Sequence, residues 1–586
     1  MKTNWDLSLF YKSHHDLKIE KDLKSIEKMC LSFARSYQNK TDYLKTEKVL
    51  AKALLRYEKL SAVLSGAKPI IYFHYVTALN SSDHFAEAAL NRMSLRLTDS
   101  TNKLLFFDLK IGKIDKKTQT KFLKSKILLP YRYFLKRIFE ISKYNLTEPE
   151  EKILNLKNLP ARQLWSQGAD KLLNTKTVRF QGKEIPMAEA MSMVSSLPTK
   201  SRRHLHSEIV RTFKSISHFA ESEINALYID KKINDSLRGF KEPYEGTILG
   251  YENDLPTVLN LVESVTKNFK ISQRFYKLKA KLLKVPYLTY ADRAASVGSI
   301  KTKFTFEDCV VLLRKAFGKL GDQYLEVLDR MLSNGQIDVY PKKGKDSGAF
   351  CSSSINNPTM VFLNHISNFN SVKTFGHEMG HAIHAEFSKK QRPFYDNHTI
   401  SVAEVASILF ENFVFEEIFE KLSPKEKIIA LHNRINDEIN TVFRQIACFN
   451  WELEMHKEIR AKGSITKEEI AKLHNKHMES YIGKIIKMKE EDGYFFVTWS
   501  HIRRHFYVYS YAYGNLISSA IYARVRANPN YMKEVEKFLS AGGSKSPSDI
   551  FLDMGIDTTK PEFFTEGLKN IEKDIKKLEQ LTKKFK

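Results

Sequence analysis

Apolar residues recur every three or four positions over long stretches of this 586-residue chain, first between Leu17 and Ala67 and again over 85–105, 116–144 and 147–174. This spacing is typical of amphipathic helices, because residues three or four apart share one helix face. The chain contains only 23 Gly and 16 Pro, which is too few for a turn-rich all-β fold or for long flexible linkers. We therefore expect a mainly α-helical protein.

Two stretches break the helical pattern. The segment TKTVRFQGKEIP, residues 175–186, predicts a short β-hairpin with a Gln-Gly turn. Within 336–366, Val, Tyr, Phe and Thr alternate with polar residues between Gly and Asn-Pro turns, which predicts two or three short strands. A break near 198–200 precedes a further helical run, so we expect a domain boundary that divides the chain into 1–199 and 200–586.

The chain carries 94 Lys and Arg against 68 Asp and Glu, a net charge of +26. A charge of this size attracts nucleic acids, anionic membranes or acidic peptides. The lysines are dispersed and interleaved with glutamates, as in KEEIAKLHNKHMESYIGKIIKMKEEDGYF at 467–495, and no nucleic-acid-binding motif accompanies them. We therefore expect a lysine-rich, solvated surface and neither a nucleic-acid nor a membrane partner.

The four cysteines are far apart and none belongs to a CxxC pair: they are Cys30, Cys309, Cys351 and Cys448. This distribution argues against a disulfide framework or a cysteine zinc site, and it favours a reducing compartment. The first twenty residues lack the apolar core of a secretory signal. No run of about eighteen apolar residues, long enough to span a membrane, occurs either. We expect a cytoplasmic protein.

The stretch TFGHEMGHAIH, from Thr374 to His384, carries the strongest chemical signal. On a helix, His377 and His381 lie on one face, where both imidazoles can bind one metal ion. Zinc favours such ligands and keeps one position for water in catalytic sites, although cobalt or manganese can take the same ligands. Glu378 falls beside that water, where it can act as a general base.

Three neighbouring residues bear on this interpretation. Gly376 and Gly380 leave the helix surface bare, so a metal or a substrate backbone can come close. His384 lies one turn beyond His381, and we expect it to support the ligands from the second shell or to pack. A His-Glu-x-x-His match also arises by chance, so the metal hypothesis needs a third ligand.

The third ligand is expected from the following helix. A metzincin would require a histidine where this chain has Phe387. Glu404, 23 residues after the second histidine, suits a thermolysin-like arrangement. The residues SVAE at 401–404 also fit a capping box, in which Glu404 would satisfy only the helix backbone. Its small apolar neighbours favour the ligand role, and Glu411, two turns on, is placed to orient a ligand histidine.

A tyrosine-rich cluster, TWSHIRRHFYVYSYAYGN, follows at 498–515. It is either an aromatic core segment or a source of the phenol and imidazole donors that stabilise an oxyanion. Gly514 and the run of β-branched and aromatic residues predict an irregular segment rather than a plain helix. From the residues alone, core packing is the favoured interpretation.

Together, HEMGHAIH, VAEVASILFEN and WSHIRRHFYVYSYAYG resemble the oligoendopeptidase F branch of the thimet oligopeptidase family of zinc peptidases. The segments YPKKGKDSGAFCSS and NWDLSLFYKS also resemble that branch, so the similarity runs along nearly the whole chain. The resemblance implies a mainly α, bowl- or clam-shaped zincin fold with a deep substrate channel and a small antiparallel β element beside the active-site helix. Residues 1–199 would form a lobe that walls or covers the channel, and 200–586 the catalytic domain.

The resemblance also implies an activity and the residues that perform it. One zinc ion would be held by His377, His381 and Glu404. Glu378 would activate the zinc-bound water, and the enzyme would cut internal bonds of short unfolded oligopeptides. His501 would help to bind the substrate and to stabilise the transition state. Its partner would be Tyr507, Tyr509 or Tyr511, of which we favour Tyr507.

Two alternatives are compatible with the motif, and a third conflicts with it. A metallocarboxypeptidase on a similar helical channel also uses His-Glu-x-x-His. A basic nucleic-acid-binding protein would hold a structural zinc with four protein ligands. A catalytically dead peptide binder conflicts with the intact Glu378.

For a peptidase, Arg503 and Arg504 could bind a peptide carboxylate, and the positive charge could favour acidic substrates. The oligomeric state is open, with a monomer favoured.

Overall fold

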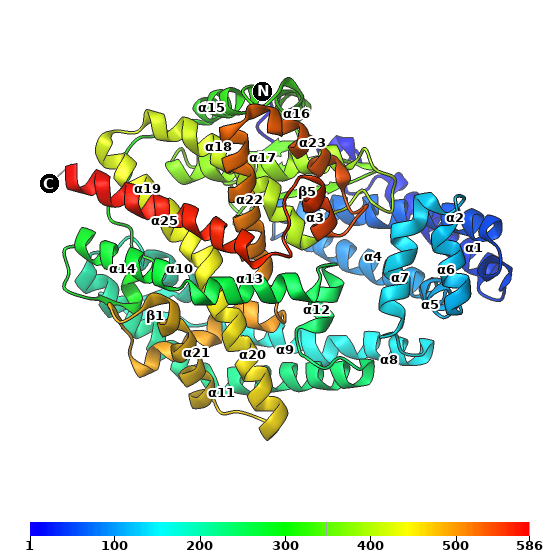
Figure 1. Cartoon of the computed structure of the whole chain (residues 1–586), viewed down its shortest axis with the longest axis horizontal. Coiled ribbons are helices and arrows are strands. Elements are labelled where there is room, and N and C mark those ends of the chain that lie inside the picture. Colours follow the sequence, from blue (N-terminus) through cyan, green and yellow to red (C-terminus); the bar gives the residue numbers. More distant parts are fainter. Residues whose placement is uncertain (347, 585–586) are drawn as a thin grey trace. The chain divides into compact units, whose positions relative to one another are not determined.

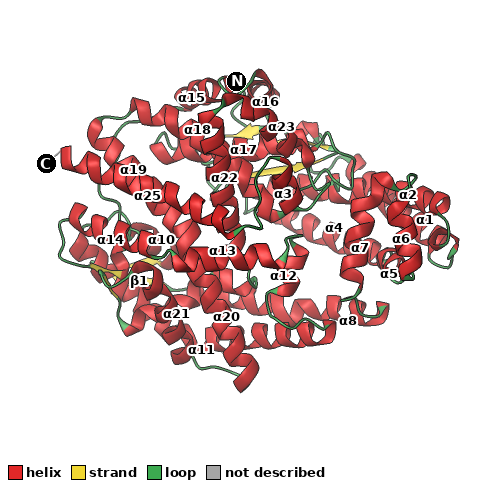
Figure 2. Cartoon of the chain, viewed as in Figure 1, coloured by secondary structure: helices red, strands yellow, loops and turns green. Residues whose placement is uncertain are grey.

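The structure is a computed structural model that describes every residue except 347, 585 and 586 (Figure 1). Helices dominate it and only short strands interrupt them, as Figure 2 shows. The expectation of a mainly α protein with small β elements is therefore confirmed. No helix in the described part of the chain combines the length and the apolar character that a membrane span requires.

The chain forms two compact units, each assembled from three separate segments. Unit 1 comprises Met1–Lys152, Thr302–Lys421 and Ile521–Met554, and unit 2 comprises Ile153–Lys301, Leu422–Ala520 and Gly555–Lys586. The expected boundary at 199/200 would instead cut the chain once, into two continuous parts. It stays a prediction.

Unit 1 contains thirteen helices and three strands among the described residues: α1 (Leu17–Tyr37), α2 (Glu47–Ser65), α3 (Lys68–Leu79), α4 (His84–Asn102), α5 (Leu105–Gly112), α6 (Lys116–Lys124), α7 (Arg132–Ser142), α15 (Phe306–Gly318), α16 (Asp322–Asn334), β4 (Ile337–Asp338), β5 (Phe350–Ser354), β6 (Asn357–Phe362), α17 (Phe369–Ser388), α18 (Ile400–Lys421), α23 (Met532–Ala541) and α24 (Pro547–Asp553). The division between the units falls within α8 (Glu148–Asn158) and within α22 (Tyr509–Ala527).

Unit 2 contains the remaining helices and strands: α9 (Leu164–Asn174), β1 (Thr177–Phe180), β2 (Lys183–Pro186), α10 (Met187–Met193), α11 (Thr199–Arg238), α12 (Glu245–Gly250), α13 (Leu255–Lys267), α14 (Lys270–Leu282), β3 (Leu288–Thr289), α19 (Pro424–Ile439), α20 (Gln445–Lys462), α21 (Lys467–Ile482), β7 (Ile486–Lys487) and α25 (Pro561–Lys584).

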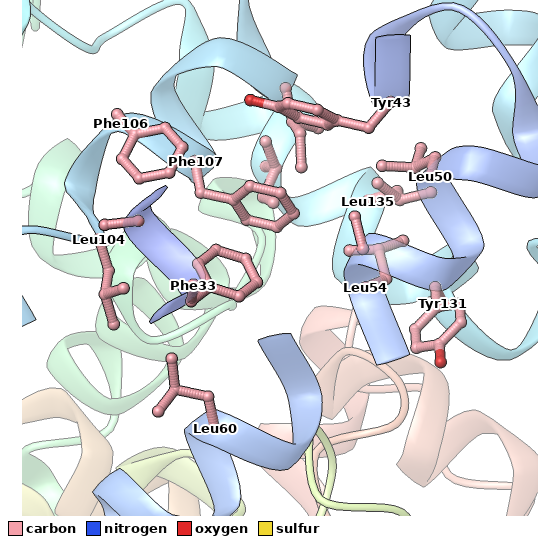
Figure 3. Close-up of a cluster of buried hydrophobic side chains, with 14 of the residues drawn as sticks. Phe33, Tyr43, Leu50, Leu54, Leu60, Leu104, Phe106, Phe107, Tyr131 and Leu135 are labelled. Atoms are coloured by element: carbon pink, nitrogen blue, oxygen red, sulfur yellow. The ribbon is translucent and has the colours of Figure 1, made fainter. Parts of the chain in front are cut away.

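A cluster of buried aromatic and aliphatic side chains joins α1, α2, α5 and α7 in unit 1 (Figure 3). The ring of Phe33 lies 5.0 Å from that of Phe107, and Tyr43 stacks on Phe107 at 5.3 Å. Leu50 and Leu54 of α2 are fully buried beside them. The three-to-four-residue apolar spacing therefore turns one face of each helix toward this core.

The sheet of unit 1 has the strand order β4-β6-β5, with β6 parallel to β4 and antiparallel to β5. Trp5 fastens the N-terminal segment to it, because the indole N–H donates to the carbonyl of Val361 at 2.8 Å and the backbone N–H donates to Asp338 at 3.0 Å. The strands expected within 336–366 are thus confirmed, and β6 leads into α17 after a short loop.

Helices α17 and α18 pack against each other with closely spaced backbones. A Cβ atom on Gly380 would lie 2.6 Å from the Cα of Ser407, and one on Gly376 would lie 3.1 Å from the side chain of Val414. Because neither glycine has a side chain, α18 can pack closely against α17 at these two positions. This corrects the interpretation that they leave space for a metal or a substrate.

In unit 2, β1 and β2 pair antiparallel as the expected hairpin. Its turn residues Gln181 and Gly182 both have positive φ, 51° and 79°, as a two-residue type I′ turn requires. The tyrosine-rich cluster is irregular only in its first part, where a 3₁₀ turn over Ser500–Arg503 precedes α22. The prediction of an irregular segment is wrong for 509–515, because α22 begins at Tyr509 and includes Gly514.

Candidate metal centre

Helices α17 and α18 of unit 1 bring three metal-ligating side chains together. The Nε2 atom of His377 lies 3.5 Å from a carboxylate oxygen of Glu404, and the Nε2 atom of His381 lies 4.0 Å from the other oxygen. One ligand atom from each of the three residues lies within 4.8 Å of the others. The two imidazole rings are nearly perpendicular, at 85°, with centroids 4.9 Å apart.

This donor set fits zinc. Ligand atoms about 2.0–2.1 Å from a tetrahedral zinc ion are about 3.3–3.5 Å apart, close to the two separations between histidine and carboxylate atoms. Two imidazole nitrogens and one carboxylate oxygen also form one of the combinations found at catalytic zinc sites, where a fourth position is left for water or substrate. The carboxylate of Glu404 lies beside the two histidines, which favours the ligand role over the capping box.

Glu411 contacts the Nδ1 side of the His377 ring, opposite to the Nε2 atom that faces Glu404. Its carboxylate accepts a hydrogen bond from Nδ1 of His377 at 3.0 Å and pairs with the ammonium of Lys373 at 3.3 Å. Burial raises the pKa of Glu411, but the Lys373 charge and the His377 hydrogen bond outweigh it and lower the pKa to about 2. The ionised carboxylate therefore fixes the ring so that Nε2 faces Glu404.

The pKa values of the two histidines differ although both side chains are half-buried. Burial lowers the pKa of His377, but the hydrogen bond and charge of Glu411 and the charges of Glu378 and Glu404 raise it to about 9. Burial and the His377 charge lower the pKa of His381 to about 3. Glu411 is thus the main difference between the two rings.

Glu378 lies on the same helix with its side chain almost covered, at 7% exposure. Burial raises its pKa to about 7; the His377 charge opposes this and the charges of Glu404 and Glu411 add to it. A carboxyl group that titrates near neutral pH can both accept and donate a proton at that pH. It faces a cavity of about 440 Å³ lined by β5, α17 and the residues around the start of α18.

His384 is placed away from the ligand group. Its ring is fully buried and stacks on His398 at 3.8 Å, with Phe538 at 5.1 Å. Sequence reasoning missed His398, which lines the cavity, and Lys373, which pairs with Glu411. The position of Lys373 could have been predicted from the sequence, because it lies four residues before His377 on the same helix. His398 lies in a loop, where no sequence pattern indicates its position.

The tyrosine-rich cluster of unit 2 brings three of the expected side chains together. The ring of His501 stacks on Tyr507 at 5.4 Å and lies edge-on to Tyr511 at 5.8 Å. The hydroxyls of Tyr507 and Tyr511 are hydrogen-bonded at 2.7 Å. The hydroxyl of Tyr509 instead accepts a hydrogen bond from the buried amide of Asn253 at 2.9 Å. Of the three tyrosines considered, Tyr509 is therefore the one that does not accompany His501.

Burial lowers the pKa of His501 to about 4, and the charges of Arg444 and Arg504 add to this effect. The imidazole is thus neutral at pH 7 and has one N–H to donate.

Arg503 does not match the prediction that it binds a peptide carboxylate. Its guanidinium is 8% exposed and makes two hydrogen bonds to the carboxylate of Glu223, at 2.8 and 2.7 Å. It also donates to the carbonyl of Trp499 at 2.8 Å. Its donors are used inside the unit, so that prediction is wrong. Arg504 is exposed, with its guanidinium 5.7 Å from the ring centre of Tyr507.

Comparison with known proteins decides the family. The sequence profile of peptidase family M3 matches residues 203–570, which is more than half of the chain, and the profile of oligopeptidase F matches residues 110–174. The chain belongs to peptidase family M3. It is therefore a metallopeptidase, and the expected resemblance to the oligoendopeptidase F branch is confirmed.

Relatives of this M3 peptidase are similar along most of their length. The oligoendopeptidase F homolog of Borreliella burgdorferi is 26% identical over 92% of this chain and 95% of its own. The structure of oligoendopeptidase F from Enterococcus faecium superposes with a TM-score of 0.71 at 18% identity, over 97% of this chain and 98% of its own. A Chlamydophila abortus protein assigned as a peptidase gives a TM-score of 0.85 at 22% identity, over 99% and 98%. These structural matches establish the M3 fold.

Proposed function

We propose that this M3 metallopeptidase is a zinc-dependent endopeptidase that cuts internal bonds of short, unfolded oligopeptides. The observation that best supports it is the meeting of the donor atoms of His377, His381 and Glu404, with Glu378 beside them in one cavity. A structural zinc site takes four protein ligands, whereas three ligands leave a position open for chemistry.

A zinc ion bound by these residues would polarise the scissile carbonyl and make a water molecule acidic enough to react at neutral pH. The chain's own residues perform the proton transfers. Glu378 accepts the proton of the attacking water and afterwards donates it to the leaving amine, because a group with a pKa of about 7 can do both. Glu411 keeps His377 oriented through both steps.

From the family resemblance we further propose that His501 and Tyr507 donate hydrogen bonds to the carbonyl oxygen as it becomes negative. The neutral imidazole of His501 has one N–H for this purpose. Tyr511 is hydrogen-bonded to the hydroxyl of Tyr507 and, when it donates, leaves the Tyr507 proton for the substrate.

The test is cleavage of a mixed pool of unstructured peptides by wild type and Glu378→Gln, read by mass spectrometry, with zinc measured in both. We expect internal cuts by the wild type, none by the variant, and about one equivalent of zinc retained in this site by both. Stepwise loss of C-terminal residues would instead identify a metallocarboxypeptidase. Equal cleavage by both proteins would exclude Glu378 as the base.

We also propose that the enzyme acts in the cytoplasm as a monomer, on peptides and without a nucleic-acid or membrane partner. The dispersed lysines and the four free cysteines support this setting. Light scattering should give a mass near 67.9 kDa, and RNA binding at physiological salt should be absent. Tight, salt-dependent RNA binding would support the nucleic-acid alternative.

A further inference from the structure

Three side chains that the peptidase chemistry does not use meet in the interior of unit 2. Glu452 and His456 lie one turn apart on α20, and His505 lies in the turn before α22. One carboxylate oxygen of Glu452 is 4.0 Å from Nε2 of His456 and 3.8 Å from Nδ1 of His505. One ligand atom from each of the three residues lies within 4.8 Å of the others.

Most polar atoms of this group have no hydrogen-bond partner. Both ring nitrogens of His456, Nδ1 of His505 and one carboxylate oxygen of Glu452 are buried and unpartnered among the described residues. The three residues are at most 3% exposed. Buried polar atoms normally find partners, because a buried polar atom left without one destabilises the fold. Several in one place indicate that a bound species satisfies them together.

The chemistry of the group favours a cation as that species. Burial lowers the pKa of both histidines well below the ordinary range, so each imidazole is neutral and has a lone pair to offer. Burial likewise raises the pKa of Glu452, and it outweighs the Phe506 hydrogen bond and the charges of Lys231 and Arg162, which lower that pKa.

The cations whose charges act on this group have other partners. Lys231 and Arg460 both pair with Asp235, and Arg162 donates to a backbone carbonyl at 3.2 Å. None of them makes an ion pair with the Glu452 carboxylate among the described contacts. A bound cation would contact that carboxylate directly.

We propose that Glu452, His456 and His505 bind a second divalent metal ion, zinc, in a closed site separate from the peptidase centre. Two imidazoles and a carboxylate are zinc ligands, and the separations of 3.8 and 4.0 Å need to shorten by only about 0.5 Å to match tetrahedral coordination. The fourth ligand would be a water molecule or Tyr228. The Tyr228 ring stacks on His456 at 4.0 Å, and its buried hydroxyl has no hydrogen-bond partner among the described residues.

The position of this group gives the ion a structural role. His505 and Phe506 both adopt left-handed backbone conformations, with φ of 46° and 60°, which are strained for residues other than glycine. Glu452 accepts a hydrogen bond from the backbone N–H of Phe506 at 2.9 Å. An ion bound between α20 and His505 would hold this strained turn, which separates His501 from Tyr507 along the chain.

The first test is metal content of the full chain, purified from zinc-supplemented medium and measured by mass spectrometry. We expect about two equivalents of zinc in the wild type and about one in His505→Asn and in Glu452→Gln. Asparagine tolerates the left-handed φ of residue 505, and glutamine keeps an oxygen for the Phe506 N–H. His432→Asn is the control, since His432 is fully buried in the same unit but outside the group; it should retain both ions.

A second test leaves the proposed inner site intact. His381→Ala disables only the peptidase centre, so this variant should bind one cobalt(II) ion after refolding with that metal and absorb visible light, and the further change His505→Asn should abolish the absorption. One equivalent of zinc in the wild type together with no cobalt in His381→Ala would overturn the proposal. Because both readouts are metal content, the result does not depend on peptidase activity.

Discussion

Glu411 accepts a hydrogen bond from Nδ1 of His377 at 3.0 Å, which leaves Nε2 facing Glu404. This contact fixes both the tautomer and the direction of the ring. Removing such a partner of a metal-bound histidine typically weakens metal binding about 10–100-fold.

We expect Glu411→Gln to reduce zinc affinity by about that factor, measured by competition with a chromophoric chelator, while the fold is retained. Activity should recover at high zinc, because the ligands themselves are unchanged. Glu420→Gln, at an exposed position of the same helix, is the control and should bind zinc normally. Unchanged affinity in Glu411→Gln would show that the ring is held by other contacts.

Tyr507 and Tyr509 are two residues apart and have different surroundings. Because Tyr507 stacks on His501 and Tyr509 bonds to Asn253, only the first is expected to serve catalysis. Tyr507→Phe should lower kcat about 100-fold with little change in KM, as expected for loss of one donor to the oxyanion. Tyr509→Phe should keep kcat within about twofold and lose about 1 kcal/mol of stability. Equal kcat values in the two variants would contradict this assignment.

Gly380 controls the distance between the two helices that hold the metal ligands. In Gly380→Ala the new methyl group would lie 2.6 Å from the Cα of Ser407, so α17 and α18 must separate. We expect a loss of about 1–3 kcal/mol in the free energy of unfolding and weaker zinc binding, since His381 and Glu404 lie on the separating helices. Chemical denaturation and zinc titration measure the two effects.

Gly318→Ala provides the matched control. Gly318 ends α15, and no described residue outside its own helical turn has a heavy atom within 4 Å of the position that a Cβ would take. Alanine there should be neutral or stabilise by up to about 1 kcal/mol. If both variants behave alike, close helix packing is not the reason for glycine at 380.

Asp108 gives unit 1 a pH dependence of stability. Burial raises its pKa from 3.8 to about 6, although the Tyr57 hydroxyl donates to it at 3.2 Å. Between these two values the folded chain holds a proton that the unfolded chain releases, so the free energy of unfolding falls as the pH rises. Asparagine does not ionise, so Asp108→Asn lacks this decrease. The free energy of unfolding of the variant minus that of the wild type should therefore rise by about 2 kcal/mol between pH 4 and pH 7.

Thermal unfolding of both proteins across that range measures the difference. Asp115 supplies a comparison of opposite sign, because the hydroxyl and backbone N–H of Thr118 lower its pKa. Asp115→Asn should therefore lose stability relative to wild type as the pH rises, the reverse of Asp108→Asn. A difference between Asp108→Asn and wild type that stays constant with pH would rule out a buried, protonated Asp108.

Local features were readable from the sequence because they depend on spacing alone. The helical periodicity fixed the mainly α class, the Gln-Gly pair marked the hairpin, and the four-residue spacing placed His377 and His381 on one helix face. The proposed third ligand could also be named from the sequence, because Glu404 lies in the first turns of the next helix. The buried position that its apolar neighbours predicted is only partly realised, since its side chain is 27% exposed.

Other features depend on residues far apart in the chain, and the sequence could not supply them. Arg503 pairs with Glu223, 280 positions away, which removes it from substrate binding. Gly376 and Gly380 face α18 instead of a metal, because the direction in which a helix face packs is a property of its neighbours. Glu452, His456 and His505 meet only once α20 and the turn before α22 are folded together. Spacing sets which side chains share a face; long-range packing sets what that face meets.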